Sequence, residues 1–584
     1  MSSKPTRLPH RAAALRPAVL LLGAGVALTG GSALAQTAGQ LAEPSYAPPV
    51  ISAEGGGVVL PAGTGAAAPA GAESLFVTPS GLRVEGALPG VEAETAAIAE
   101  RLTNRRVSAA ALFAAASELE AAYARAGYVL ARVVLPPQTV ADGAPLTLSV
   151  IDGHVSGVET EGLPPRAASR VTEVLAPLVG QRQLTRHELE RRLLLAGDIP
   201  GLELGTTLKA GEQLGTTVLV ETGTARPVTG FFALNNELSD DLGTTAFSLG
   251  ADLNNLWGQG EVVYLRLGGS AEGLDDDFFG SDPLNRQVVA GFTAPLGIDG
   301  VWINGEVVDS RNEPDRDSGL TLSDGFRRTS LVLGWTELRS RTANHTFSLG
   351  FDWVETSQEL QFGDLKDDFT EDRLRVLRLT AEGDHASLAG GRVRGTVTAS
   401  FGLDAFGARS ASDTLPLSRD GASPDFTTLA ASGSYRRLFA DGDVALRLSG
   451  KAQTSFGDAL PSSEMMGITG ANWLSAFDTG TLTGDSAAVI RAEMSLPRTY
   501  PGPIQAAPYA FAAAGVAWLE EPTAQEEARA QGTSFGIGAE FGASLADAMY
   551  PGADASFRIE YARGNLDDGT GFDDRLNLSL VSRF

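Results

Sequence analysis

The chain has 584 residues, with 45 Lys and Arg against 71 Asp and Glu, and a net charge of -26. A nucleic-acid-binding surface needs clustered positive charge, so this balance argues against nucleic acid as a partner. The chain contains no Cys, which excludes disulfides, thiolate nucleophiles and Cys-based metal sites.

The first 35 residues have the pattern of a secretory signal. An apolar stretch, residues 17–28, follows four basic residues: Lys4, Arg7, Arg11 and Arg16. The small residues Ala33 and Ala35 precede Gln36, and this spacing is typical of a signal-cleavage site. A transmembrane anchor is the alternative, but the apolar run is short and broken by glycines. We expect residues 1–35 to be a removable signal peptide.

Residues 36–73 are rich in Ala, Gly and Pro, a composition typical of a flexible linker. Their only charges are Glu43, Glu54 and Glu73, and their apolar residues show no helical period. We therefore predict no regular structure in this segment.

Residues 74–153 have the pattern of a small α+β unit. Ser108 is a suitable N-cap for a helix that runs to about Ala126. Two strand-like runs, residues 128–135 and 146–150, follow with a turn between them.

A second unit of the same kind spans residues 154–225. Thr185 and Glu188 have the spacing of a capping box at the start of a helix. The strand-like runs 202–208 and 216–220 follow that helix. Each unit is too small for a large core, so we expect the two to work as a pair.

Residues 226–584 are expected to form strands throughout. No run of 18 apolar residues follows the signal, so only a closed barrel could span a membrane. Strands of about 9 to 11 residues with their turns fit roughly sixteen times into this length. The polar stretches 272–285 and 310–323 are expected to be external loops.

Side-chain patterning supports this interpretation. All six Trp and all but two of the 25 Phe lie beyond residue 225, as in the aromatic girdles of membrane barrels. Apolar residues alternate along the chain at Phe535, Ile537 and Phe541. A large β-sandwich or solenoid with an aromatic core is the alternative. The predicted fold is mostly β: an antiparallel transmembrane barrel preceded by two small α+β domains.

One motif resembles that of an enzyme. Residues 532–536 match G-x-S-x-G, which marks a hydrolase nucleophile when it lies on a strand-to-helix turn. Here it lies inside an alternating strand. The five His residues have no metal-ligand spacing. We predict no catalytic site, no metal and no cofactor.

Several short motifs resemble one known family. They include residues 126–138 (AGYVLARVVLPPQ) and 184–201 (LTRHELERRLLLAGDIPG), the pair Asn235-Asn236, and residues 461–464 (PSSE) with 467–470 (GITG). Together they are similar to the hemolysin-activator family of two-partner secretion transporters. The resemblance implies that the two small domains are POTRA domains in the periplasm and that the barrel lies in the outer membrane.

The resemblance also implies a function and partners. The POTRA domains would capture an unfolded secreted exoprotein of the hemolysin or adhesin class, by strand addition, and the barrel would pass it outward. The segments expected to bind this client contain Tyr128, Val133, Leu135 and Gln138 in the first domain and Leu204, Thr206 and Leu208 in the second. The terminal Phe584 would be the assembly signal for the barrel-assembly machinery.

Membrane lipid and lipopolysaccharide would surround a monomeric barrel. Two alternatives stay open from the sequence. An assembly factor or insertase of the same superfamily would use the barrel seam instead of the lumen. A passive porin or receptor would not need the two front domains.

A loop that folds into the lumen is expected from the same resemblance. Its tip contains Trp473, Leu474, Ser475, Ala476 and Phe477, and Gly484 and Asp485 follow. The family's tip is Val-Arg-Gly-Phe or Val-Arg-Gly-Tyr, so its Arg and Gly are both replaced here.

The partner of the family's Arg is an Asp two residues after a Phe on a barrel strand. Here Ala513 follows Phe511 in that place. Loss of both charges avoids leaving one buried alone. We therefore expect Trp473, Leu474 and Phe477 to hold the loop by packing. We also expect no N-terminal helix that plugs the pore.

Overall fold

The computed structural model describes residues 36–41, 68–272, 274, 278–314, 320–362, 365–411, 415–500, 504–544, 553–569 and 571–584. The expected signal, residues 1–35, and residues 42–67 of the expected linker lie outside these ranges. Within them, no helix has the length and apolar character needed to cross a membrane.

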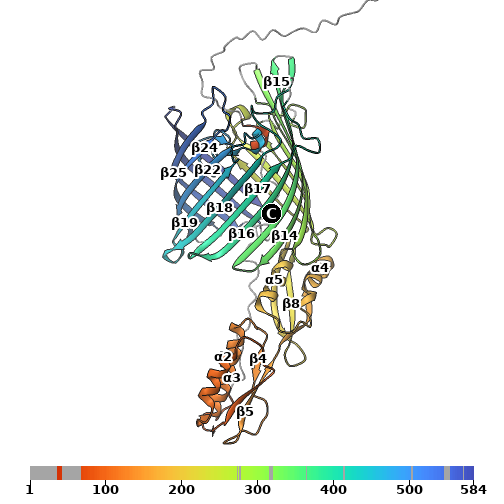
Figure 1. Cartoon of the computed structure of the whole chain (residues 1–584), viewed down its shortest axis with the longest axis vertical. Coiled ribbons are helices and arrows are strands. Elements are labelled where there is room, and N and C mark those ends of the chain that lie inside the picture. The colour runs from red at the N-terminus through yellow and green to blue at the C-terminus, as the bar shows by residue number, and fades with distance from the viewer. Residues whose placement is uncertain are drawn as a thin grey trace, which may run out of the picture. The chain divides into compact units, whose positions relative to one another are not determined.

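The first small domain consists of a three-stranded sheet with helices packed on it (Figure 1). Its elements are β1 (Phe76–Val77), β2 (Gly81–Glu85), α2 (Glu92–Leu102), β3 (Val107–Ser108), α3 (Ala109–Arg125), β4 (Arg132–Val134) and β5 (Pro145–Ile151). The sheet has the order β2-β5-β4. The Ser108 hydroxyl accepts a hydrogen bond from the Ala111 amide, which confirms the predicted N-cap. The strand expected over residues 128–135 is shorter than predicted.

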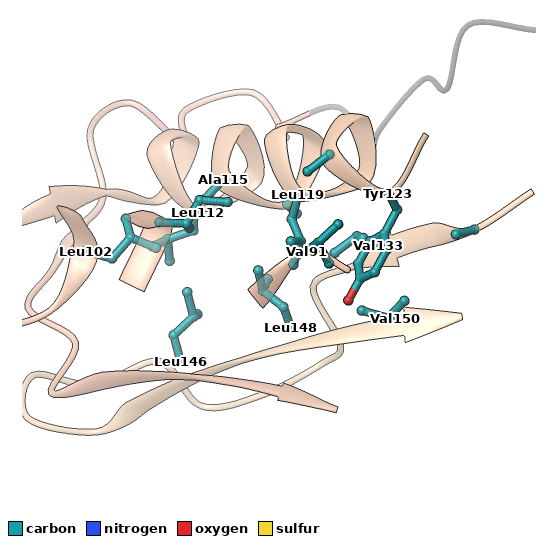
Figure 2. Packing of buried hydrophobic residues seen from close by; sticks show 14 of the residues in the cluster. Val91, Leu102, Leu112, Ala115, Leu119, Tyr123, Val133, Leu146, Leu148 and Val150 are labelled. Carbon is teal, nitrogen blue, oxygen red and sulfur yellow. The ribbon is translucent and has the colours of Figure 1, made fainter. Parts of the chain in front are cut away.

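Helix α3 packs its apolar face against this sheet. Leu112, Leu119 and Tyr123 of α3 are fully buried against Leu146 and Leu148 of β5 (Figure 2). The spacing of these helix residues places them on one face, and alternate residues of β5 point toward them.

The second small domain repeats this arrangement. Its elements are β6 (His154–Glu161), α4 (Pro165–Leu175), η1 (Ala176–Leu178), α5 (Arg186–Gly197), β7 (Leu202–Ala210) and β8 (Thr216–Ala225). The sheet order is β6-β8-β7, so β7 lies at one edge. The predicted capping box is confirmed, because the side chains of Thr185 and Glu188 each bond to the other's backbone amide.

The described residues from 228 onward form a closed antiparallel barrel of 16 strands. These are β9 (Val228–Asn235), β10 (Ala246–Asn254), β11 (Val262–Ser270), β12 (Asn285–Pro295), β13 (Val301–Asn312), β14 (Leu320–Arg339), β15 (Ala343–Phe362), β16 (Leu365–Leu388), β17 (Gly391–Gly402), β18 (Thr427–Phe439), β19 (Val444–Thr454), β22 (Ser486–Ser495), β24 (Ile504–Trp518), β25 (Arg529–Ser544), β26 (Asp554–Leu566) and β27 (Phe572–Arg583). The two-residue β23 (Arg498–Thr499) extends the hairpin between β22 and β24.

The two faces of the barrel wall differ in polarity, as predicted. Phe535 and Ile537 of β25 are 47% and 65% exposed on the outer face, where lipid would cover them. Ser534 of the same strand is buried on the inner face. The barrel and the β-rich fold are therefore confirmed.

Three neighbouring strands are much longer than a membrane requires. Strands β14 and β15 have 20 residues each and β16 has 24, whereas about 9 to 11 cross the bilayer. The loop expected over residues 310–323 is therefore wrong in its bounds, because β13 continues to Asn312 and β14 begins at Leu320. The loop expected over residues 272–285 lies between β11 and β12, as predicted, and β12 begins at Asn285.

The residues directly after the expected cleavage site also differ from the prediction. A four-residue helix, α1 (Ala38–Leu41), occurs where we expected only a linker. Ala38 is fully buried in an apolar cluster with Phe326 and other barrel side chains. A Cβ at Gly39 would lie 3.2 Å from the Phe326 ring, so small residues allow this close packing. A helix of one turn leaves no periodicity that sequence analysis could detect.

Candidate functional site

The candidate site is the segment between β19 and β22, residues 455–485, which we call the lumen loop. It contains η4 (Ser462–Glu464) and a small antiparallel pair, β20 (Met466–Gly467) and β21 (Thr483–Gly484). Its tip, residues 473–477, packs against inward-facing side chains of the barrel wall.

Apolar packing holds the tip. Leu474 is fully buried, and Ala476 and Phe477 are 5% exposed. They belong to one cluster with the inward-facing Phe511 and Ala513 of β24. The sequence placed these two strand residues opposite the loop, and the structure brings them together. Trp473 lies at the border of the cluster.

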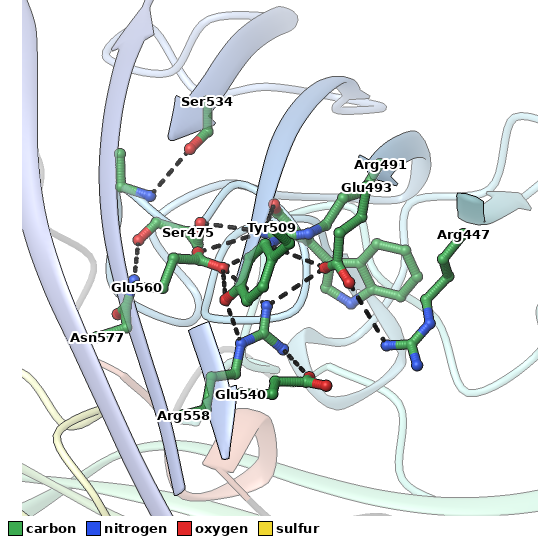
Figure 3. Close-up of polar contacts among 12 residues, drawn as sticks. Arg447, Ser475, Arg491, Glu493, Tyr509, Ser534, Glu540, Arg558, Glu560 and Asn577 are labelled. Atoms are coloured by element: carbon green, nitrogen blue, oxygen red, sulfur yellow. Dashed lines mark hydrogen bonds and ion pairs between the residues drawn. The ribbon is translucent and has the colours of Figure 1, made fainter. Parts of the chain in front are cut away.

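Polar contacts hold the tip as well, which the packing hypothesis did not include. The Ser475 hydroxyl accepts a hydrogen bond from Arg491 at 3.2 Å, and its carbonyl accepts one from the Asn577 side chain at 2.8 Å. The Ala476 amide donates to the Ser534 hydroxyl at 3.2 Å (Figure 3). The tip is therefore bonded to strands β22, β25 and β27.

A buried ion network lies directly behind these contacts. The Glu560 carboxylate of β26 is 2.5 Å from Arg491 and 2.7 Å from Arg558, and it accepts a hydrogen bond from Tyr509 at 2.7 Å (Figure 3). Glu493 lies 3.6 Å from Arg491. Charged hydrogen bonds of this kind are stronger than neutral ones.

This network changes the interpretation of the missing charge pair. Arg491 lies on β22 directly opposite Ala513 of β24 in the strand register. A guanidinium is therefore present beside the loop tip, but it comes from the barrel wall, and its carboxylate comes from β26. The expectation that Trp473, Leu474 and Phe477 hold the tip by packing instead of by charge is therefore incomplete, because Ser475 also contacts this guanidinium.

Sequence reasoning missed Arg491 and Glu560. Their signal was nonetheless present, since charged residues alternate with apolar ones in the strand segment from Ile490 to Glu493. Such charges inside a membrane strand must face the lumen.

Ion pairs also hold the loop before and after its tip. Glu464 lies 2.7 Å from Arg378 of β16. Asp485, fully buried, lies 2.5 Å from Arg419 and accepts a hydrogen bond from the Leu460 amide at 2.7 Å. Gly484, the other predicted residue here, lets two backbones approach closely, because a Cβ there would lie 2.8 Å from the Trp518 carbonyl.

The predicted client-binding side chains of the first domain lie in its own structure. Val133 is buried in the domain core, and Tyr128 and Leu135 pack against that core. The Gln138 amide makes two hydrogen bonds to the Thr147 backbone. These side chains support the domain, and only Val133 is fully buried, whereas Tyr128, Leu135 and Gln138 are half-exposed.

The predicted segment of the second domain shows the same arrangement. Leu204 and Leu208 of β7 pack against the domain core. The Thr206 hydroxyl donates to Glu221, which is almost fully buried. Burial raises the pKa of Glu221 to about 7. The backbone of β7 pairs only with β8 in the described part of the chain, so its other edge can accept a strand.

The predicted terminal residue lies at the barrel closure. The Phe584 amide and carbonyl form hydrogen bonds of 2.9 and 2.7 Å with the backbone of Gly230 in β9. A Cβ at Gly230 would lie 2.8 Å from the Phe584 ring. Phe584 thus extends the pairing between the first and last strands.

A closed barrel with an inward-folded loop and POTRA-type domains before it defines a POTRA-barrel protein of the outer membrane. The haemolysin secretion/activation protein family ShlB/FhaC/HecB matches residues 215–539, and the ShlB-type POTRA domain matches residues 77–153. The chain belongs to the haemolysin secretion/activation family. Its barrel is therefore an outer-membrane barrel, and its N-terminal domains lie in the periplasm.

Individual relatives are more distant. The heme/hemopexin transporter protein HuxB of Haemophilus influenzae (strain 86-028NP) is 25% identical over 176 residues, which are 30% of this chain and 31% of that protein. The outer membrane transporter CdiB of Escherichia coli O6:K15:H31 (strain 536 / UPEC) is 24% identical over 231 residues, 39% of this chain and 37% of CdiB. The matched part thus spans about a third of each relative.

Solved structures extend the likeness over most of the fold. CdiB from Escherichia coli superposes with a TM-score of 0.67 at 20% identity, covering 88% of this chain and 92% of that one. CdiB from Acinetobacter baumannii gives 0.58 at 16% identity, covering 88% and 91%. These structures share the architecture of this chain.

Proposed function

We propose that this chain is the outer-membrane translocator of a two-partner secretion system, which captures an unfolded exoprotein and passes it through the barrel lumen. The observation that carries the proposal is the lumen loop. Its tip lies among inward-facing side chains of β22 to β27, held by Ser475, Leu474 and Phe477. A passive pore has no need of such a latched segment.

Capture would use the open edge of β7. An extended client can add to a free strand edge through backbone hydrogen bonds, which require little sequence specificity. The edge of β4 in the first domain is a poorer candidate, because the Glu120 carboxylate accepts a hydrogen bond from the Val133 amide there at 2.9 Å. The second domain would therefore make the main contact.

Export would then require the loop to move. The contacts of Ser475 with Arg491 and Asn577 would break, while the Arg491–Glu560 pair would stay in the wall. Keeping this ion pair intact lowers the cost of opening, since the buried Arg491 keeps its carboxylate partner. Client folding outside the cell would supply the driving force.

Conductance of the purified protein in planar bilayers tests this function. We expect a purified client exoprotein to block the pore of the full-length protein. A variant without residues 74–225 should conduct without being blocked. Equal block of both proteins would contradict capture by the POTRA domains, and no block of either would contradict passage through the lumen.

One observation favours an insertase as the second candidate. Strands β27 and β9 pair over only five residues, from Ser579–Asn235 to Arg583–Phe231, whereas β26 and β27 pair over twelve. A short seam could open toward the lipid. The variant Ala233→Cys/Val581→Cys, at directly opposed positions, would lock it. We expect the locked barrel to secrete client normally, whereas loss of secretion would favour the insertase.

A further inference from the structure

The turn that follows β9, residues 236–239, joins the two strands of the seam by side-chain bonds. The Asn236 amide nitrogen donates to the Leu576 carbonyl at 2.7 Å, and its side-chain oxygen accepts from the Leu578 amide at 2.7 Å. The side chain therefore takes the place of a backbone partner and lengthens the short pairing of β9 with β27.

Arg575 of β27 connects this turn to the lumen loop. One of its guanidinium nitrogens donates to the Asn236 carbonyl at 2.8 Å, and the other is bonded to the Asp478 carboxylate, next to the loop tip. Asn577, two residues along the same strand, donates to the Ser475 carbonyl at 2.8 Å. Strand β27 thus holds the loop and the turn with adjacent inward-facing side chains.

The N-terminal segment is bound to the same turn. The Gln36 amide nitrogen donates to the Glu237 carbonyl at 3.1 Å, and its side-chain oxygen accepts from the Ser239 amide at 3.0 Å. The Gln36 carbonyl accepts from the Asn312 side chain at 3.0 Å. Gln36 is 2% exposed, so these three bonds are shielded from water and cannot be replaced by it without movement.

We infer that the turn couples the N-terminal segment to the lumen loop, and that Arg575 and Asn236 are the positioning residues that transmit loop opening to the segment. This inference rests on the proposed movement of the loop. When the loop leaves, Arg575 loses Asp478. Two other carboxylates, Glu237 of the turn and Asp240 directly after it, act electrostatically on Arg575.

A guanidinium that turns toward those carboxylates gives up its bond to the Asn236 carbonyl. The Glu237 carbonyl, which accepts a hydrogen bond from the Gln36 side chain, would then shift, because Glu237 directly follows Asn236. Loop opening would therefore weaken the binding of α1 in the lumen. The lumen loop and α1, which both occupy the lumen, would then leave it together. Coupling of this kind requires an element with two arrangements that both sites influence, and the turn is that element.

Site-specific labelling tests the coupling without any client. The chain has no native Cys, so Ala38→Cys supplies a single thiol on the buried face of α1. Arg575 contacts Asn236 and Asp478, and we expect Arg575→Ala to raise the rate of maleimide labelling at position 38 about tenfold, the change that about 1.4 kcal/mol produces. The matched control is Arg583→Ala at the other end of the same strand. Arg583 forms an ion pair with Asp554 of β26.

Pore conductance recorded on the same proteins shows whether the loop has moved. Higher conductance of Arg575→Ala together with faster labelling supports the coupling. Higher conductance with unchanged labelling overturns it, and so does no change in either. Failure of purified client to block the pore, while Arg575→Ala still shows both changes, would count against the proposed function alone.

A second measurement covers the case in which Ala38→Cys does not fold. Gln36→Ala, Arg575→Ala and the double variant are compared by open probability in planar bilayers. We expect the double variant to differ little from either single variant, because both changes release the same turn. Additive effects would overturn the inference.

Discussion

Removing the charge of Glu560 tests how the wall network supports the lumen loop. In Glu560→Gln, the carboxylate that accepts bonds from Arg491, Arg558 and Tyr509 becomes an amide. Both guanidinium groups then depend on Glu493, at 3.6 and 3.7 Å. Breaking a buried ion pair costs about 3 to 5 kcal/mol of stability. Because Glu493 remains as a partner, we expect Glu560→Gln to cost about 3 kcal/mol.

Part of this loss would destabilise only the closed state of the loop, because Arg491 also donates a hydrogen bond to Ser475 in that state. If the closed state is destabilised by about 1.4 kcal/mol, the ratio of open to closed pores rises about tenfold. Single-channel recording in planar bilayers measures this ratio. Glu540→Gln is the control, since the Glu540 side chain is 42% exposed and lies 3.9 Å from Arg558, where a pair is worth little. An open probability unchanged in Glu560→Gln would refute the reasoning.

Three further predictions concern local features. Thr185→Ala removes the capping box of α5 and should cost about 1 kcal/mol of stability in the second domain, seen as faster proteolysis there. Burial raises the pKa of Glu221 to about 7 from 4.5, so its contribution to stability is complete below pH 4.5 and declines by about 3 kcal/mol as the pH rises to 7. Pulse proteolysis at pH 5 and 8 should show this decline, and Glu221→Gln should remove it. Gly470 has φ 108°, and a Cβ there would lie 2.5 Å from the Thr479 hydroxyl. Gly470→Ala should therefore raise open probability more than Gly457→Ala, which has φ 98° and open space around it; equal effects would contradict a steric cause.

Much of the fold could be predicted because it depends on sequence patterns among neighbouring residues. Ser108 and Thr185 identified two helix starts, since capping depends on neighbouring residues alone. Alternation at Phe535 and Ile537 identified the outer barrel face, because the period of a strand is two. The bounds of β14 could not be read from the chain, because alternation does not show where a strand leaves the membrane.

The site could be predicted only in part. The tip residues Leu474 and Phe477 were found from a motif and lie as expected. The partners Arg491 and Glu560 come from strands far apart in the sequence, and only closure of the barrel brings them together. Gln36 was missed for the same reason, since its hydrogen-bond partners lie some 200 residues further along the chain.

A reversible lock on the lumen loop tests the central claim, that client passes through the lumen under control of this loop. The Ser534 hydroxyl lies 3.2 Å from the Ala476 amide, so Ala476→Cys/Ser534→Cys places two thiols close enough to join, in a chain that has no other Cys. Secretion of the client is measured in the oxidised and reduced states, with each single-Cys variant as control. We predict that the oxidised double variant secretes nothing and that reduction restores export. Undiminished secretion through a fully cross-linked barrel would contradict the lumen route.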